Sequence, residues 1–301
     1  MRVFVTGASG HIGSAVVPEL LRAGHQVVGL ARSDEAAATV AGYGAEVRLG
    51  SLDDLDGLKD AAASADGVIH LAFDHARMRA GQLAEAAQGE MDAVKAFGEV
   101  LAGTGKALVA TAGTLPMGMF GLNGRPGTEQ DVFPGGPRLD NENLTIGLAE
   151  QGVRSSVLRL APMIHSDLDK HGFTPALIGF ARENGFAAYI GDGANRWSAA
   201  NSYDIGVLYR LAVEKAPAGT RLHGVADTAI PFKTVAETIA GKLGLQAKSV
   251  TVDEAPQYLR FLAPFAGLDA PVSTEITRKV LGWEPKHAGW VEDVESGHYF
   301  G

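Results

Sequence analysis

The sequence contains no cysteine among its 301 residues. This absence excludes disulfide bonds, thiolate metal sites and cysteine nucleophiles. Hydrophobic residues make up 46% of the chain, yet no uninterrupted apolar run reaches the roughly 20 residues of a transmembrane helix. The first expected strand begins at Arg2, which leaves no room for a cleavable signal. We therefore expect a protein that stays in the cytoplasm and does not span a membrane.

Dense basic segments are also missing. The chain has 26 Lys and Arg against 35 Asp and Glu, which gives a net charge of -9. Nucleic acid and anionic membranes are therefore poor partners, and a small molecule is the expected one. Aromatic residues are few, at 7%. Several lie near the C-terminus, where they are expected either to pack internally or to form a homodimer interface: Trp283, Trp290, Tyr299 and Phe300.

The N-terminus carries the most informative pattern. The apolar run 3–5 predicts a buried strand, and the segment Thr6-Gly7-Ala8-Ser9-Gly10-His11-Ile12-Gly13 leads from it into residues with helical spacing. Gly7 would permit the tight turn, Gly10 the approach of a pyrophosphate, and Gly13 close packing of helix on strand. This context predicts a dinucleotide site. The alternative is a tight turn in a fold that holds no cofactor.

The dipeptide Arg32-Ser33 follows the second expected strand, 25–31. An enzyme specific for NAD usually has an acidic residue about 20 residues past the last glycine, whereas an arginine suits the 2'-phosphate of NADP. Asp34 comes one residue too late and is expected to cap the next helix. We therefore predict NADP, with NAD as the second choice. The alternative is that Arg32 is only a solvated loop residue.

Strand and helix patterns alternate along the first half of the chain. Further strands are expected at 46–49, 67–72, 106–111 and 154–162. We expect Asp53 to cap a helix at 54–63, and a long helical stretch at 75–102 to be interrupted near Gly89. This alternation predicts an α/β fold with a Rossmann-type, doubly wound parallel sheet that binds its ligand at the carboxyl ends of the strands. We assign 1–162 and about 199–225 to this domain, and about 163–198 and 226–301 to a smaller substrate lobe.

The glycine spacing resembles that of extended and atypical short-chain dehydrogenase/reductases, a superfamily that includes sugar-nucleotide epimerases and dehydratases. The segments 159–165, 191–193, 203–206 and 282–285 resemble later parts of the same superfamily. The resemblance implies that further positions contact the cofactor. These are Ser9, His11, Ile12, Ser33, Ser51, Leu52, Leu71, Ala72, Phe73, Thr111, Pro162 and Ile164.

The usual catalytic pair of that superfamily is missing. Most members have Tyr-x-x-x-Lys after the fifth strand, where the lysine lowers the pKa of the tyrosine that donates the proton. The segment 112–157 contains neither a tyrosine nor a lysine. Our alignment puts Arg138 at the tyrosine position and Glu142 at the lysine position. A guanidinium does not release a proton near neutral pH, but it stabilises an oxyanion or binds a carboxylate.

Other residues are candidates for the missing chemistry. Thr114 is expected either to hydrogen-bond a substrate carbonyl or to satisfy loop backbone. His165 lies near the expected nicotinamide position, and the segment 165–171 is read as an acid–base or metal cluster or, alternatively, as a polar linker; we predict no metal. Tyr189 is either a proton donor or a packing residue. His70 is expected to be a core histidine.

Together these patterns predict an NAD(P)-dependent oxidoreductase that prefers NADPH and acts on a carbonyl or alcohol. The apolar segment 115–122 is expected to form one wall of the substrate pocket, which suggests a small and fairly apolar substrate. The alternative from another class is a non-catalytic NAD(P)-binding sensor, because such a protein would need the glycine loop but not the tyrosine and lysine.

Overall fold

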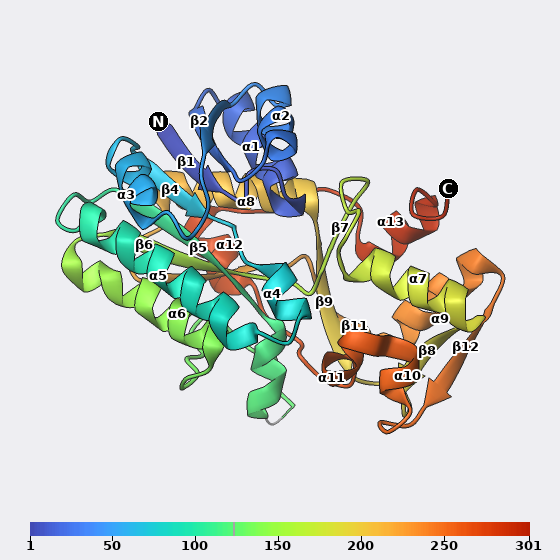
Figure 1. Ribbon diagram of the computed structural model, residues 1–301. Coiled ribbons are helices and arrows are strands. Elements are labelled where there is room, and N and C mark those ends of the chain that lie inside the picture. The colour runs from blue at the N-terminus through green and yellow to red at the C-terminus, as the bar shows by residue number, and fades with distance from the viewer. Residues whose placement is uncertain (123) are drawn as a thin grey trace.

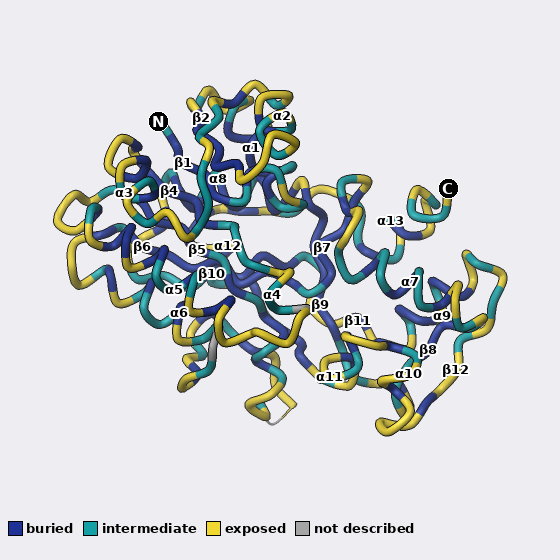
Figure 2. Tube along the Cα trace, viewed as in Figure 1, coloured by how far each residue is buried: buried dark blue, intermediate teal, exposed yellow. Residues whose placement is uncertain are grey.

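The computed structural model describes residues 1–122 and 124–301. Figure 1 shows a larger body built around one sheet and a smaller lobe beside it, with the C-terminus on the lobe. Buried residues follow the strands of the sheet, and exposed residues follow the peripheral loops (Figure 2). Within the described residues no helix is long and apolar enough to cross a membrane.

Seven parallel strands form the central sheet in the order β10-β6-β5-β4-β1-β2-β3. They are β1 (Arg2–Thr6), β2 (Gln26–Ala31), β3 (Glu46–Leu49), β4 (Gly67–His70), β5 (Ala107–Gly113), β6 (Arg154–Leu160) and β10 (Thr220–Gly224). The order reverses between β1 and β4, and this switch point is where such folds bind ligands. The predicted doubly wound fold is confirmed.

Helices cover both faces of this sheet because each has one apolar side. One face carries α1 (His11–Arg22), α2 (Asp34–Gly42), α8 (Ser202–Lys215) and α12 (Glu275–Leu281). The other carries α3 (Leu55–Ala63), α5 (Leu83–Leu101) and α6 (Pro137–Gly147). The short helices η1 (Leu115–Phe120) and η2 (Leu148–Gln151) follow β5 and α6.

The smaller lobe contains two small sheets, β11-β9-β7 and β12-β8. Its strands are β7 (Met163–His165), β8 (Phe186–Ile190), β9 (Arg196–Asn201), β11 (Asp227–Pro231) and β12 (Gln246–Val250). Its helices are α7 (Phe173–Asn184), α9 (Phe232–Leu243), α10 (Ala255–Leu259), η3 (Arg260–Leu262), α11 (Ala263–Ala266) and α13 (Trp290–Ser296). Trp290 is buried in the core of this lobe, whereas Trp283 packs with the core on the α1 face of the sheet. Both tryptophans therefore serve the chain's own packing.

Three local expectations were wrong. The stretch 75–102 is broken between α4 (His75–Arg79) and α5, where Gly81 has a φ of 80°, and not at Gly89, which lies inside α5. Asp54, not Asp53, caps α3 by accepting a hydrogen bond from the Gly57 amide. Ser33, not Asp34, caps α2, because its Oγ accepts from the Ala36 amide while Asp34 is already helical.

Candidate functional site

Two glycines of the N-terminal loop are required by packing. Gly7 has a φ of 68°, and a Cβ there would lie 2.9 Å from the Ala72 amide nitrogen. A Cβ on Gly13 would lie 2.4 Å from the carbonyl oxygens of both Gly7 and Ala8. Gly10 is exposed, and its Cβ would meet only the Gly7 carbonyl, at 3.3 Å. The loop therefore packs tightly against β4 and α1 and leaves its outer side, at Gly10, open to a ligand.

The start of α1 is suited to an anion. Gly10 is its N-cap residue, and no side chain in the described part of the chain caps it there. The first amide groups of a helix have no partner within the helix and carry the positive end of its dipole. The first turn, His11 to Gly13, adds no acidic residue. A pyrophosphate therefore fits the loop in charge and in hydrogen bonding.

Arg32 lies exposed at the end of β2, beside the loop that follows β4. The Arg77 amide does most to hold the pKa of Asp74 below its ordinary value, against the opposing effect of burial. The Arg77 charge, the Ala76 amide and the Arg32 charge make smaller contributions in the same direction. The Ser33 hydroxyl is already engaged as the cap of α2. Arg32 is thus an exposed cation at the carboxyl end of β2, where the sequence predicts the 2'-phosphate of NADP to bind.

Behind the loop, Thr6 and His70 join β1 to β4. The Thr6 Oγ1 lies 2.7 Å from His70 Nδ1 and accepts a hydrogen bond of 3.2 Å from the Ala72 amide. Burial, with a smaller contribution from Arg138, lowers the pKa of His70 to about 3. His70 is therefore a neutral core histidine near pH 7, and Thr6, which contacts its ring, holds the segment before Phe73.

Arg138 lies at the carboxyl edge of the sheet, on the first turn of α6. Its Nη2 donates a 3.2 Å hydrogen bond to the Thr111 carbonyl and lies 3.4 Å from Glu90 Oε1. Its guanidinium carbon lies 4.1 Å from the ring centroid of Phe73. The side chain keeps 27% of its surface exposed. The structure thus brings together three of the predicted site residues, Phe73, Thr111 and Arg138.

Comparisons with known proteins agree with this geometry. Residues 3–130 match the NAD dependent epimerase/dehydratase family. An uncharacterized protein of Schizosaccharomyces pombe is 43% identical over 302 residues and covers 100% of both chains. The chain belongs to the NAD dependent epimerase/dehydratase family. It is also 39% identical to an uncharacterized protein of Saccharomyces cerevisiae, over 99% of both chains. A dTDP-glucose 4,6-dehydratase from Streptomyces venezuelae, solved with NAD bound, shares the fold, with a TM-score of 0.78, 16% identity and coverage of 99% of this chain and 96% of that one.

Glu142, which our alignment places at the lysine position of the superfamily pattern, makes structural contacts. It is buried and binds Arg159 of β6, with Arg159 Nε 2.9 Å from its Oε2. Arg221 of β10 donates to its Oε1 at 2.6 Å. Burial opposes ionisation of Glu142, but the two arginines lower its pKa below the ordinary value. Glu142 therefore joins α6 to β6 and β10, and these contacts support a structural role.

Two side chains beside Arg138 escaped the sequence analysis. Tyr209 of α8 is fully buried, and its hydroxyl lies 2.7 Å from Thr111 Oγ1, while burial raises its pKa. Glu90 of α5 is buried next to Arg138. A signal existed for Glu90, because it interrupts an apolar face with helical spacing. The other buried members of that face include Ala86, Ala87, Ala93, Val94 and Phe97.

The structure does not bring the other predicted catalytic residues to Arg138. Thr114 is fully buried, with Oγ1 3.3 Å from both the Leu160 carbonyl and Ser198 Oγ, which favours the loop-backbone alternative. His165 is buried, with Nδ1 2.8 Å from Asp293. Tyr189 lies in β8, whose main contacts are with the lobe elements α7, α9, α10 and β12. These three roles remain predictions.

The segment 165–171 contacts the glycine loop. His11 Nδ1 lies 3.4 Å from Asp169 Oδ1, and His11 Nε2 lies 2.9 Å from Ser202 Oγ. The order Ser–His–Asp resembles a hydrolase triad, but Ser202 is fully buried and donates to the His165 carbonyl. No group of three potential metal ligands occurs within residues 1–122 and 124–301. The contact therefore ties α1 to the lobe.

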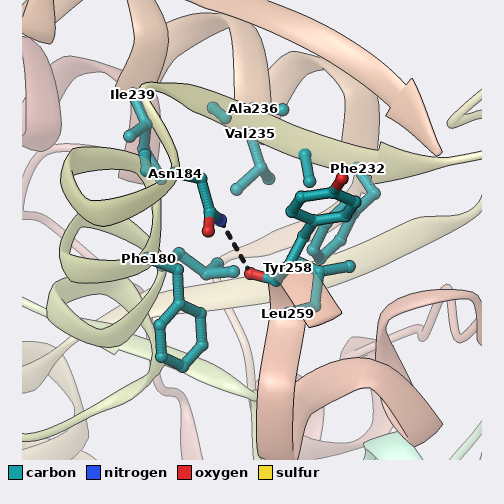
Figure 3. Close-up of a pocket in the computed structure, with 12 residues that line it drawn as sticks. Phe180, Asn184, Phe232, Val235, Ala236, Ile239, Tyr258 and Leu259 are labelled. Atoms are coloured by element: carbon teal, nitrogen blue, oxygen red, sulfur yellow. Dashed lines mark hydrogen bonds between the residues drawn. The ribbon is translucent and has the colours of Figure 1, made fainter. Parts of the chain in front are cut away.

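Two hollows lie elsewhere. One, in the lobe, is lined by residues including Phe180 and Asn184, whose Nδ2 donates to the Tyr258 carbonyl at 3.0 Å (Figure 3). Its volume of about 10 Å³ is close to the space of one water molecule. The other, of about 190 Å³, lies beside the predicted pocket wall 115–122 and is lined in part by Gly118 and Leu122.

Proposed function

We propose that this protein is an NAD(P)-dependent oxidoreductase that prefers NADPH and interconverts a carbonyl and an alcohol on a small, fairly apolar molecule. The observation that carries the proposal is the position of Arg138, a fixed and partly exposed cation at the carboxyl edge of a dinucleotide-binding sheet. The epimerase/dehydratase family and the NAD bound to the Streptomyces venezuelae dehydratase support a nicotinamide cofactor.

The residues present fit such a cofactor. The amides at Gly10 to Gly13 would hold the pyrophosphate at the uncapped start of α1. Arg32 would bind the 2'-phosphate of NADPH, which NADH lacks. Phe73 and Thr111 would border the nicotinamide end. When bound, the cofactor supplies or accepts the hydride.

Arg138 would stabilise the negative charge that develops on the substrate oxygen during reduction. A guanidinium stays protonated near neutral pH, so it would act by charge and hydrogen bonding and not as the acid. Since His165 is buried and Tyr189 lies in the lobe, solvent water is the proton source that this arrangement favours. The exposed part of Arg138 is consistent with access of water to this edge.

Fluorescence titration with NADPH and NADH tests the cofactor assignment. Tighter binding of NADPH is expected, and binding of neither nucleotide would contradict the proposal. A screen of small ketones and aldehydes with NADPH then tests for turnover.

A second candidate is a non-catalytic NAD(P)-binding sensor. The burial of Thr114 and His165, two of the predicted catalytic residues, supports this alternative. Tight NADPH binding without turnover of any carbonyl compound, together with a nucleotide-dependent change in binding to another macromolecule, would support the sensor over the enzyme.

A further inference from the structure

A buried carboxylate lies directly behind Arg138. Glu90 belongs to the apolar face of α5 and is only 2% exposed. Burying an acid on an apolar helix face is unfavourable unless a partner compensates. Its partner is Arg138, at 3.4 Å, and no step of the proposed reaction uses Glu90 directly.

The guanidinium of Arg138 is held from three sides. Glu90 lies on α5, the Thr111 carbonyl on β5, and the ring of Phe73 on the segment after β4. Asn141, one turn further along α6, lies close enough to Glu90 to favour its ionised form and so to oppose the rise of its pKa. Glu90 Oε2 has no hydrogen-bond partner among the described residues. Arg138 is thus the ion-pair partner of the Glu90 carboxylate, which is otherwise poorly solvated.

We propose that Glu90 is a positioning residue for Arg138 that also sets how much of its positive charge reaches the substrate oxygen. This inference rests on the proposed function. With Glu90 ionised, the pair is nearly neutral and the guanidinium interacts weakly with a developing oxyanion. With Glu90 protonated, Arg138 keeps the same place but its charge is uncompensated.

The electrostatic surroundings place this change near neutral pH. Burial raises the pKa of Glu90 to about 7, against the opposing effects of Arg138 and Asn141. Two other ionisable groups lie nearby. His70 on β4 is neutral at this pH, and Arg77 on α4 lies beside Gly89, the residue before Glu90 on α5. Reduction should therefore slow as the pH rises through about 7.

The first experiment compares the pH dependence of kcat in the wild type and in Glu90→Gln. The wild-type kcat should fall about 10-fold from about pH 6 to about pH 8.5, the scale of roughly one pKa unit of charge interaction. The Gln variant should lose this dependence. Glu85→Gln is the matched control, since Glu85 is an exposed acid on the same helix, and it should behave like the wild type. An unchanged profile in Glu90→Gln would overturn the inference.

The second experiment needs no turnover. Urea unfolding of the wild type, Glu90→Gln, Arg138→Met and the double variant forms a double-mutant cycle. The shifts in free energy of unfolding should be non-additive at about pH 8.5, where Glu90 is ionised, and close to additive at about pH 5. Additive shifts at both pH values would overturn the inference. If the wild type turns over no carbonyl compound, the proposed function fails, while this cycle still decides whether Glu90 and Arg138 are coupled.

Discussion

The two ends of the predicted cofactor site differ in how far they follow the family. The glycine loop has all three glycines of the superfamily spacing. At Gly7 and Gly13, backbone contacts leave no room for a Cβ. At the opposite end, the segment 112–157 contains neither a tyrosine nor a lysine, and our alignment places Arg138 and Glu142 at those positions. Steric constraints on a backbone allow few substitutions, whereas a catalytic end built from side chains can change its chemistry on the same scaffold.

The largest effect is expected at Glu142, the buried acid that our alignment places at the lysine position. Glu142→Ala leaves Arg159 buried without its carboxylate, so the free energy of unfolding should fall by about 3 to 5 kcal/mol in urea titrations. The lowered pKa of Glu142 adds a pH signature. The contribution of Glu142 to the free energy of unfolding should be fully present above pH 4.5, the ordinary pKa of a glutamate. It should be lost as the pH falls through the lower pKa of Glu142 in the folded protein.

Glu150→Ala is the control for that variant, because Glu150 is exposed in the segment that follows α6. It should change stability by less than about 0.5 kcal/mol. If Glu142→Ala kept wild-type stability but lost all activity, Glu142 would have a functional role like that of the missing lysine, and the contrast between the two ends would weaken.

Gly13→Ala tests the steric constraint on the glycine loop, at the other end of the site. The added methyl would meet two backbone carbonyls at 2.4 Å, which flexible side chains cannot relieve. Stability should fall by about 2 to 3 kcal/mol, with NADPH binding weakened as the loop shifts. Gly42→Ala, where a Cβ has no neighbour within 4 Å, should leave both unchanged or slightly raise stability. Equal behaviour of the two variants in urea titrations would contradict the steric account.

Arg32→Ala sharpens the assignment of the nucleotide. It should reduce NADPH affinity by roughly 1.5 to 3 kcal/mol, the scale of a charge-assisted contact, with little effect on NADH. Arg22→Ala at the far end of α1 is the control and should leave both affinities unchanged. Equal losses for the two nucleotides would mean that Arg32 does not read the 2'-phosphate.

Much of the fold could be predicted from the sequence because local patterns determine it. The mostly buried strands β1, β2, β4, β5 and β6, and the glycines between β1 and α1, could be predicted from periodicity and turn chemistry. The break in the helical stretch 75–102 was misplaced because Gly89 and Gly81 look alike in sequence. Only the structure shows that Gly81 has a positive φ.

The candidate site was predictable only in part, because its partners come from distant segments. Arg138 was found by alignment, but Glu90 lies 48 positions earlier and belongs to another helix. The pairing of Glu142 with Arg159 likewise depends on how α6 packs against β6. Thr114 lies next to β5 in the sequence, yet its complete burial follows from contacts with Leu160 and Ser198. The helical spacing marks Glu90 as a buried acid, but its pairing with Arg138, like the other pairings, is set by tertiary packing and leaves no local signal.

In the proposed function, Arg138 stabilises the negative charge that develops on the substrate oxygen, and the glycine loop holds the nucleotide independently of Arg138. The most direct test is to measure kcat, KM and NADPH affinity of Arg138→Met with a carbonyl substrate from the screen. We predict that kcat falls roughly 10- to 1000-fold, the upper part being the scale of a lost oxyanion donor, while KM and the Kd for NADPH change little. A higher KM with unchanged kcat would instead make Arg138 a site for a substrate carboxylate. Wild-type values of all three constants in a folded variant would contradict the claim.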